Sequence, residues 1–187
     1  MPAAGWAANS GASILWVTPQ GVPPETEAAL KTHRNASIYV LGGEDAVPDA
    51  VFDALGKLGT AKRISAADAV STAIAVARYS DNGFGWGVVD PGHGLVFANA
   101  RRPQDAAAAA PLSAHGKYAP LLLLGDDAGA LPPALQDYLL DIQPGYDEST
   151  PAVRGVYNHG WISRRVSMRS WTAAASALSS PMIQPWL

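Results

Sequence analysis

The sequence contains no cysteine and few charged residues. Without thiols, the chain cannot form a disulfide scaffold, a thiolate zinc site or a cysteine nucleophile. Charged residues make up 16% of the chain, against about 25% in an ordinary globular domain. No apolar run approaches the ~20 residues that a membrane-spanning helix needs. We therefore expect no membrane insertion.

Apolar residues account for 48% of the 187 residues, and 35 residues are alanine. This is enough apolar surface to bury a core, which argues against disorder. The net charge of −3 hides a split, because residues 1–150 hold nine basic and sixteen acidic side chains whereas residues 151–187 hold four arginines and no acid. Four arginines are sparse for a nucleic-acid-binding arm. We expect this basic segment to dock on protein, and we expect no nucleic-acid partner.

Short β-rich apolar runs alternate with alanine-rich amphipathic stretches, a pattern typical of an α/β fold with a mostly parallel sheet and helices on both faces. The expected strands are Ser13–Val17, Ser37–Leu41, Ala61–Ile64, Trp86–Val89, Leu95–Ala98, Pro120–Leu124 and Val153–Asn158. The expected helices run from Pro23 to about His33, over Pro48–Leu58 with Gly59 as C-cap, over Ala69–Tyr79 and Gln104–His115, from Pro132 to Leu140, and over Ser170–Leu178.

An internal repeat links the two halves of the chain. Val22-Pro23-Pro24 and Leu30 match Leu131-Pro132-Pro133 and Leu139 at a constant offset of 109 residues. Each copy reads as a strand, a helix that begins at the Pro-Pro pair, and a second strand. Self-similarity of this kind indicates tandem modules, although an α/β chain can also show such coincidences. The chain therefore reads as about one and a half units of a repeated module.

Several segments, in the right order and spacing, resemble the type 2 cell wall-binding repeat. They are Ile38–Pro48, Arg63-Ile64-Ser65 with Asp68 and Thr72-Ala73, Val96–Asn99, Pro103–Ala106, Pro111-Leu112, Ala119–Leu124 and Leu131-Pro132. Two departures stand out. Ala69-Val70 replaces the Arg-Tyr of the repeat's central segment, and Asn158-His159-Gly160 stands where a Gly-Gly is expected.

The resemblance implies Toprim-like tandem α/β modules that anchor surface proteins noncovalently to an anionic wall polymer, either a polysaccharide or a teichoic-type polymer. On this basis we expect a partial first repeat unit over residues 11–63, a second unit over 64–165 that shares the core, and a Trp/Arg segment over 166–187 that packs on the body or on a partner. The implied location is the cell wall or cell surface. No signal peptide is visible in residues 1–10, so a cytoplasmic protein and a piece of a longer secreted chain both stay open.

Two loops at the carboxyl ends of expected strands are candidate anion sites. Gly42-Gly43 precedes a helix, whose N-terminal amides favour anions. Glu44 and Asp45, however, would repel a phosphate. The two glycines also suit a tight turn without a ligand. Asn99 with Arg101 and Arg102 is the stronger candidate, because paired guanidinium groups suit phosphate and carboxylate, and the alternative is a solvated loop. Arg63 and Arg78 are weaker candidates.

No pattern in the sequence indicates catalysis, a cofactor or a metal. The four histidines lack a ligand at helical spacing, no serine lies in a G-x-S-x-G context, and there is no GxGxxG. Asp126 and Asp127 suit a turn beside Gly125, and an enzyme with an acidic Toprim-like site would need them to converge with Glu44 or Asp45. We therefore expect a noncatalytic binding module.

The alternative is a self-assembling structural subunit, such as a surface-layer or filament-like protein. Tryptophan and arginine are typical of interface hot spots, and the C-terminal segment is rich in both. We expect a homo-oligomer or contacts with neighbouring repeat modules, with the candidate interface residues Trp161, Arg164, Arg165, Trp171 and Trp186.

Overall fold

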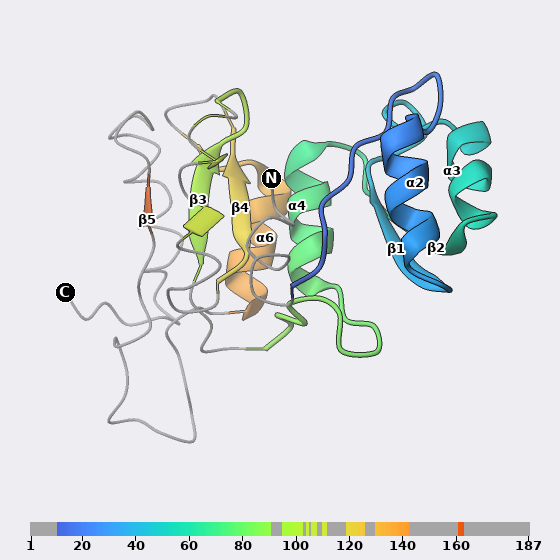
Figure 1. Cartoon of the computed structure of the whole chain (residues 1–187). Coiled ribbons are helices and arrows are strands. Elements are labelled where there is room, and N and C mark those ends of the chain that lie inside the picture. The colour runs from blue at the N-terminus through green and yellow to red at the C-terminus, as the bar shows by residue number, and fades with distance from the viewer. Residues whose placement is uncertain are drawn as a thin grey trace. The chain divides into compact units, whose positions relative to one another are not determined.

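The computed structural model describes residues 11–90, 95–102, 104, 106–107, 110–111, 119–125, 130–142 and 161–162. It divides the chain into two compact units, which we call unit 1 (Ala69–Leu187 with Met1–Ala12) and unit 2 (Ser13–Asp68). Each unit combines short parallel strands with helices, so the mixed α/β class is confirmed (Figure 1). The boundaries of the repeat units at residues 11–63, 64–165 and 166–187 stay a prediction.

Unit 2 is built around a two-stranded parallel sheet. The strands pair in register from Ala36 opposite Gly59 to Leu41 opposite Ile64. Proline at or just before a helix start provides the backbone angle that the first turn needs without losing a hydrogen bond, and both helices of this unit begin in that way. The elements are α2 (Pro24–Thr32), β1 (Ala36–Leu41), α3 (Asp49–Gly56) and β2 (Gly59–Ile64).

The core of unit 2 lies between its sheet and both helices. Leu30 of α2, Val40 of β1, and Val51 and Leu55 of α3 belong to one hydrophobic cluster, and none is more than 7% exposed. Val51 and Leu55 lie four residues apart, so they share one face of α3. Both helices therefore bury an apolar stripe in the same core.

Unit 1 contains a three-stranded parallel sheet in the order β4-β3-β5. Val96 pairs with Leu121 of one neighbour and with Trp161 of the other, which makes β3 the central strand. The elements are α4 (Ala69–Arg78), β3 (Val96–Asn99), β4 (Leu121–Leu124), α6 (Pro133–Ile142) and β5 (Trp161–Ile162).

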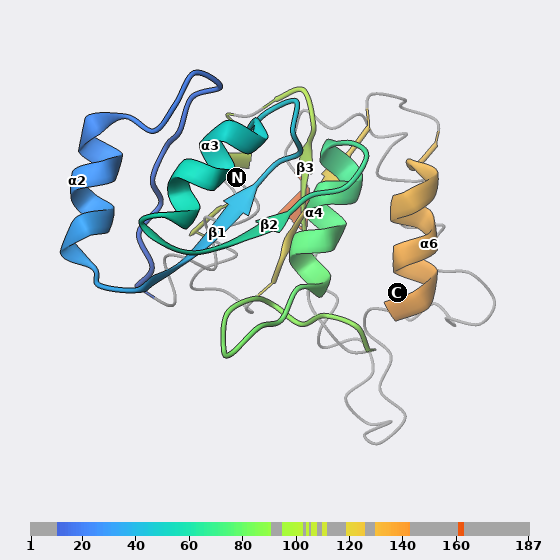
Figure 2. The same cartoon turned by 90° about the vertical axis from the view of Figure 1, so that its right-hand side faces the viewer.

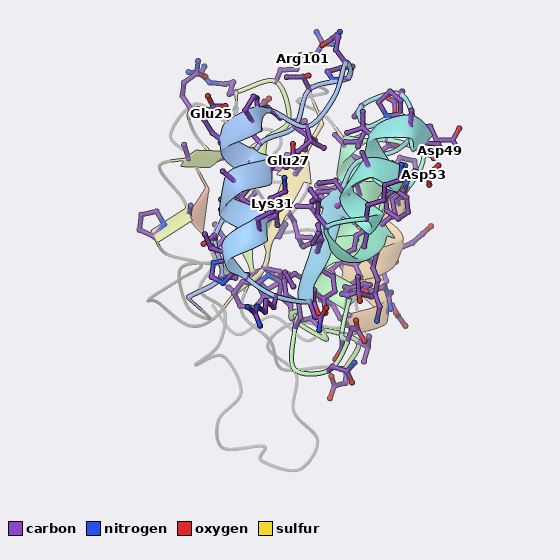
Figure 3. The ribbon with its side chains drawn as sticks, turned by 45° about the vertical axis from the view of Figure 1, so that its right-hand side comes forward. Glu25, Glu27, Lys31, Asp49, Asp53 and Arg101 are labelled. Atoms are coloured by element: carbon purple, nitrogen blue, oxygen red, sulfur yellow. The ribbon has the colours of Figure 1, made fainter. Side chains whose placement is uncertain are left out.

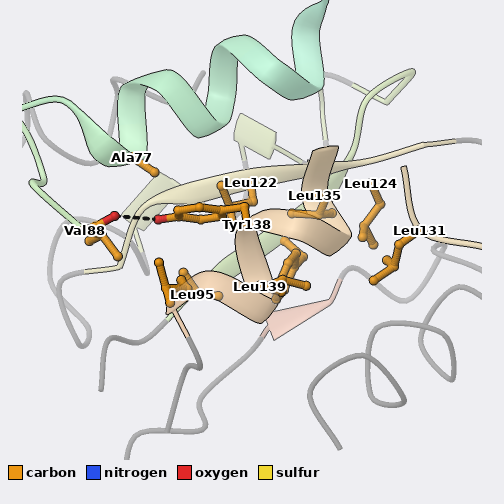
Figure 4. Packing of buried hydrophobic residues seen from close by; sticks show 11 residues of the cluster. Ala77, Val88, Leu95, Leu122, Leu124, Leu131, Leu135, Tyr138 and Leu139 are labelled. Carbon is orange, nitrogen blue, oxygen red and sulfur yellow. Dashed lines mark hydrogen bonds between the residues drawn. The ribbon is translucent and has the colours of Figure 1, made fainter. Parts of the chain in front are cut away.

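Alternate residues of β3 and β4 enter two different cores. Phe97 and Leu122 pack with α4 and α6 in one cluster (Figure 4). Val96 and Leu121 pack with the helical residue Ala106 in a second cluster. Successive side chains of a strand point to opposite faces, so the sheet of unit 1 has helical residues on both faces.

Two expected strands are absent. Residues 13–17 form no strand, and the carbonyl of Trp16 instead accepts a hydrogen bond of 2.7 Å from the Thr26 hydroxyl of α2. Residues 86–89 also form no strand, because the Gly87 and Val88 amides donate to Tyr79 O and Ala77 O at the end of α4. Both segments have a strand-forming composition, but the hydrogen bonds named here go to α2 and to residues at the end of α4.

Gly59 is not the C-cap that the sequence predicted. Helix α3 ends at Gly56 with Lys57 as its C-cap, and Gly59 is the first residue of β2. A Cβ on Gly59 would lie 2.4 Å from the Ala36 carbonyl oxygen. The residue is glycine because the two strands approach closely at this point.

The expected elements Val153–Asn158 and Ser170–Leu178 lie outside the described residues. Of the expected helix over 104–115, the described residues 104, 106–107 and 110–111 are helical. Both Pro-Pro helix starts are confirmed, since α2 begins at Pro24 and α6 at Pro133. Among the described helices, none is long and apolar enough to cross a bilayer.

Candidate functional site

The loop that follows β3 is compact and carries two adjacent arginines. The Ala100 amide donates to Leu124 O at 2.9 Å, which extends the β3–β4 ladder by one residue. Asn99 then closes the turn, because its side-chain oxygen accepts from the Arg101 amide at 2.8 Å and its carbonyl accepts from the Arg102 amide at 3.1 Å. Asparagine commonly forms such turns. The loop therefore has a defined shape, with Arg101 exposed at the carboxyl end of the sheet.

No acidic residue lies in this loop or in the strand before it, over residues 95–102. Arginine presents a planar fork of donors that matches phosphate and carboxylate oxygens. Figure 3 labels the side chain of Arg101. The stretch from residue 95 to residue 102 thus carries positive charge only, and Asp105 follows three residues later.

The loop that follows β1 is organised by Arg63 of β2. One terminal guanidinium nitrogen, Nη1, donates to Gly42 O at 3.0 Å and to Val47 O at 2.8 Å. The other, Nη2, donates to Asp49 Oδ1 at 2.9 Å. The guanidinium carbon also lies 4.7 Å from the centre of the Phe52 ring. Arg63 therefore joins the end of β1 to the start of α3.

Gly42 adopts a backbone conformation that favours glycine, with φ of +123°. Its amide donates to Ile64 O at 3.1 Å, and a Cβ on it would lie 3.1 Å from that of Ala46. The carbonyl of Gly43 accepts the amides of Ala46 and Val47. The two glycines thus allow a tight turn between β1 and α3.

The turn after β1 is a poor place for an anion. Glu44 and Asp45 are exposed within it, and Asp49 pairs with Arg63, whose side chain is only 18% exposed. Like charges raise the electrostatic cost of bringing a phosphate or carboxylate close. The contacts of Arg63, Gly42 and Gly43 build this turn, and a ligand-binding role for these three residues stays a prediction.

A groove between α4 and α6 in unit 1 was not predicted from the sequence. Its volume is about 360 Å³, and its lining residues are Ser71, Ile74, Arg78, Ala134, Asp137, Tyr138 and Asp141. The spacing of these residues puts each set on one face of its helix. Helical spacing alone does not indicate that the two faces meet.

Arg78, Asp141 and Tyr138 form a fixed cluster at one end of this groove. Arg78 makes an ion pair with Asp141, and its guanidinium carbon lies 4.8 Å from the centre of the Tyr138 ring. The Tyr138 hydroxyl donates to Val88 O at 3.1 Å (Figure 4). Burial raises the pKa of Tyr138 well above its usual range, and Arg78 opposes this effect. The hydroxyl therefore stays protonated and keeps its hydrogen bond.

The structure brings the predicted site residues together in two separate groups. Asn99, Arg101 and Arg102 share the loop of unit 1, whereas Gly42, Gly43 and Arg63 share the turn of unit 2. The backbone of Trp161 pairs with β3. The other interface candidates, Arg164, Arg165, Trp171 and Trp186, lie outside the described residues, as do Asp126 and Asp127. Within the described part of the chain, no group of three His, Asp or Glu side chains could hold a metal ion.

Comparisons with known proteins agree with the motifs. The family described as cell wall binding domain 2 (CWB2) matches residues 63–157, slightly more than half of the chain. Among solved structures, Cwp6 from Clostridium difficile has a similar fold, with a TM-score of 0.65 and 17% sequence identity. That similarity covers 84% of this chain and 25% of Cwp6, so this chain spans about a quarter of that protein. None of the curated proteins matches. The chain belongs to the cell wall binding domain 2 family.

Proposed function

We propose that this chain is a noncatalytic module that holds a protein at the cell surface by binding an anionic cell-wall polymer. Membership of the cell wall binding domain 2 family supports binding to the wall. The observation that carries the choice of an anionic polymer is the loop after β3, where Arg101 and Arg102 are adjacent and residues 95–102 contain no acid. Polymer phosphates or carboxylates would pair with these guanidinium groups.

Within unit 1, the Arg101–Arg102 loop is a better anion site than the turn after β1 is within unit 2. In the turn after β1, the exposed Glu44 and Asp45 add negative charge beside Arg63. The Asn99 turn, in contrast, fixes the backbone that carries Arg101. A rigid turn lowers the entropic cost of binding. We therefore assign polymer contact to Asn99, Arg101 and Arg102.

The test compares binding of the full chain to two immobilised probes, a purified anionic wall polymer and peptidoglycan stripped of that polymer. We expect saturable binding to the first and little binding to the second. Binding should weaken steadily as salt rises, because exposed ion pairs are screened. Equal binding to stripped peptidoglycan, or binding that salt does not change, would contradict the proposal.

Self-assembly is a second candidate function, and one observation favours it. Ile14, Leu15 and Trp16 are consecutive and are 49%, 38% and 72% exposed. Adjacent exposed apolar side chains often mark a protein interface. We expect the chain to dimerise or oligomerise at high concentration in analytical ultracentrifugation, and Trp16→Ser to shift it toward the monomer. A strict monomer across the concentration range rules this function out.

A further inference from the structure

The groove between α4 and α6 has the dimensions of a site for a small ligand. Figure 2 shows the two helices side by side, and residues of both line the groove. Along α4 the lining extends from Ser71 to Arg78, which corresponds to about 10 Å of helix. A volume of about 360 Å³ lies at the small end of the range for ligand pockets, about 300–1,000 Å³. The groove therefore suits a compact ligand rather than a peptide.

Contacts with neighbouring side chains hold the polar groups at one end of the groove. The ion pair with Asp141 and the ring of Tyr138 hold the Arg78 guanidinium in place, and the hydrogen bond to Val88 O anchors Tyr138. A guanidinium group donates hydrogen bonds and cannot accept them. Arg78 therefore offers donors at a fixed position, and a ligand would not have to organise them on binding.

Asp137 supplies the opposite chemistry. It lies one turn before Asp141 on α6, is exposed, and makes no hydrogen bond or ion pair with another described residue. An ionised carboxylate only accepts hydrogen bonds. Ile74 of α4 adds an apolar side chain to the lining of the groove. The groove thus combines fixed donors, an available acceptor and an apolar patch.

The charge in the groove limits which ligand can bind. Its lining contains one guanidinium and two carboxylates, so an anion would meet net negative charge. The arginine is already neutralised by Asp141. A hydroxyl group, in contrast, can donate to Asp137 and accept from Arg78. A ring with several hydroxyls and a C–H face can contact Arg78 as donor, Asp137 as acceptor and the apolar side chain of Ile74 at the same time.

We propose that the groove between α4 and α6 binds an uncharged sugar ring of the wall polymer. This inference deepens the proposed function, on which the assignment to a wall polymer rests. Sugar hydroxyls bond to Asp137 and to the Arg78 pair, and the C–H face of the ring packs on Ile74. The groove thus binds the neutral sugars of a polymer whose charged groups bind at the Arg101–Arg102 loop.

The test is a titration of the isotope-labelled full chain, followed by amide chemical shifts. The probes are glucose, mannose and N-acetylglucosamine, with glucuronate as the anionic counterpart and protonated glucosamine as the cationic one. We expect at least one neutral sugar to shift α4 and α6 amides in a saturable way, at millimolar concentration. Glucuronate should bind at least about tenfold more weakly, because the groove is acidic. The absence of saturable shifts with all three neutral sugars overturns the proposal.

Variants of Asp137 identify its role. Asp137→Ala should weaken sugar binding by about tenfold, which corresponds to the loss of one charge-assisted hydrogen bond. Asp137→Asn keeps an acceptor oxygen and should bind within about threefold of the unchanged chain. Asp53→Ala, at an exposed aspartate of α3, is the matched control and should change nothing. Binding of glucosamine alone, abolished by Asp137→Asn, would identify a cation site and refute the proposal.

The two proposals fail in different ways. Arg101→Ala/Arg102→Ala should leave the binding of the free neutral sugar unchanged. Asp137→Ala should weaken polymer binding by at most about tenfold, the loss that it causes for the free sugar, and should keep the salt dependence of polymer binding. If polymer binding is intact but no sugar binds, the inference fails and the proposed function stands. If sugars bind in the groove but the anionic polymer does not bind, the proposed function fails and the groove stays a sugar site.

Discussion

Replacing Arg101 and Arg102 together by alanine is expected to weaken binding to the anionic wall polymer by about 100-fold. Each guanidinium provides charge-assisted hydrogen bonds to phosphate or carboxylate, and each tenfold loss corresponds to about 1.4 kcal/mol. The dependence of binding on salt should also become shallower, because fewer ions are displaced. Equilibrium binding to the immobilised polymer at several salt concentrations measures both effects.

Two control variants separate the site from the overall charge. Arg34→Ala/Lys57→Ala removes the same charge from two exposed positions of unit 2 and should change affinity by less than about threefold. Arg101→Lys/Arg102→Lys keeps the charge and loses the planar fork of donors, so an intermediate loss of about tenfold is expected. If the unit 2 control weakens binding as much as the Arg101/Arg102 variant, binding depends on net charge and not on this loop.

Arg63→Ala is expected to destabilise unit 2 by about 3 kcal/mol and to leave the polymer-binding loop unaffected. The substitution removes the donors to Gly42 O and Val47 O, and hydrogen bonds to charged groups contribute about 1.5–3 kcal/mol each. Contact with the Phe52 ring contributes about 0.5–1 kcal/mol more. The ion pair adds little, because the Asp49 side chain is 67% exposed.

Amide hydrogen exchange over residues 36–64 is the appropriate measurement, because two units need not unfold in one step. A loss of about 3 kcal/mol lowers protection by about 100-fold. Lys62→Ala, at the exposed neighbouring position of β2, is the matched control and should change the free energy by at most about 0.5 kcal/mol. If Arg63→Ala leaves protection unchanged but abolishes polymer binding, Arg63 is a ligand and its bracing role is secondary.

Much of the fold follows from local sequence signals. Consecutive leucines at 121–124 predict a buried, central strand. β4 is a mostly buried strand there, but in the described sheet it lies at the edge and β3 is the central strand. The Pro-Pro pairs predict helix starts at two places 109 residues apart, and Pro24 and Pro133 begin α2 and α6. Proline fixes the backbone angle at the point where a helix can lose an amide donor. Such signals depend on a few adjacent residues, so a single sequence is sufficient to read them.

The two strand predictions that are wrong share a cause. Residues 13–17 and 86–89 have strand-forming composition, but a strand also needs a partner along its edge. In the structure, α2 contacts the first segment through Thr26, and the end of α4 takes the amides of the second. The composition of a segment does not determine which groups its backbone will hydrogen-bond to after folding.

Part of the candidate site could also be predicted from local sequence, and part could not. Asn99, Arg101 and Arg102 are close in sequence, so their common loop could be predicted. The bracing contacts of Arg63 connect residues up to 21 positions apart, and the ion pair of Arg78 with Asp141 spans 63 positions. Only the pairing of β1 with β2, and the packing of α4 beside α6, bring these groups together. The groove could therefore not be found from periodicity alone.

Contact between the loop after β3 and the anionic wall polymer can be observed residue by residue. The most direct measurement is a chemical-shift map of the labelled full chain titrated with fragments of the purified polymer. We expect the largest shifts on the amides of Ala100, Arg101 and Arg102, while those of Gly42–Val47 stay in place. Large shifts at Gly42–Val47, with none at residues 100–102, would contradict it.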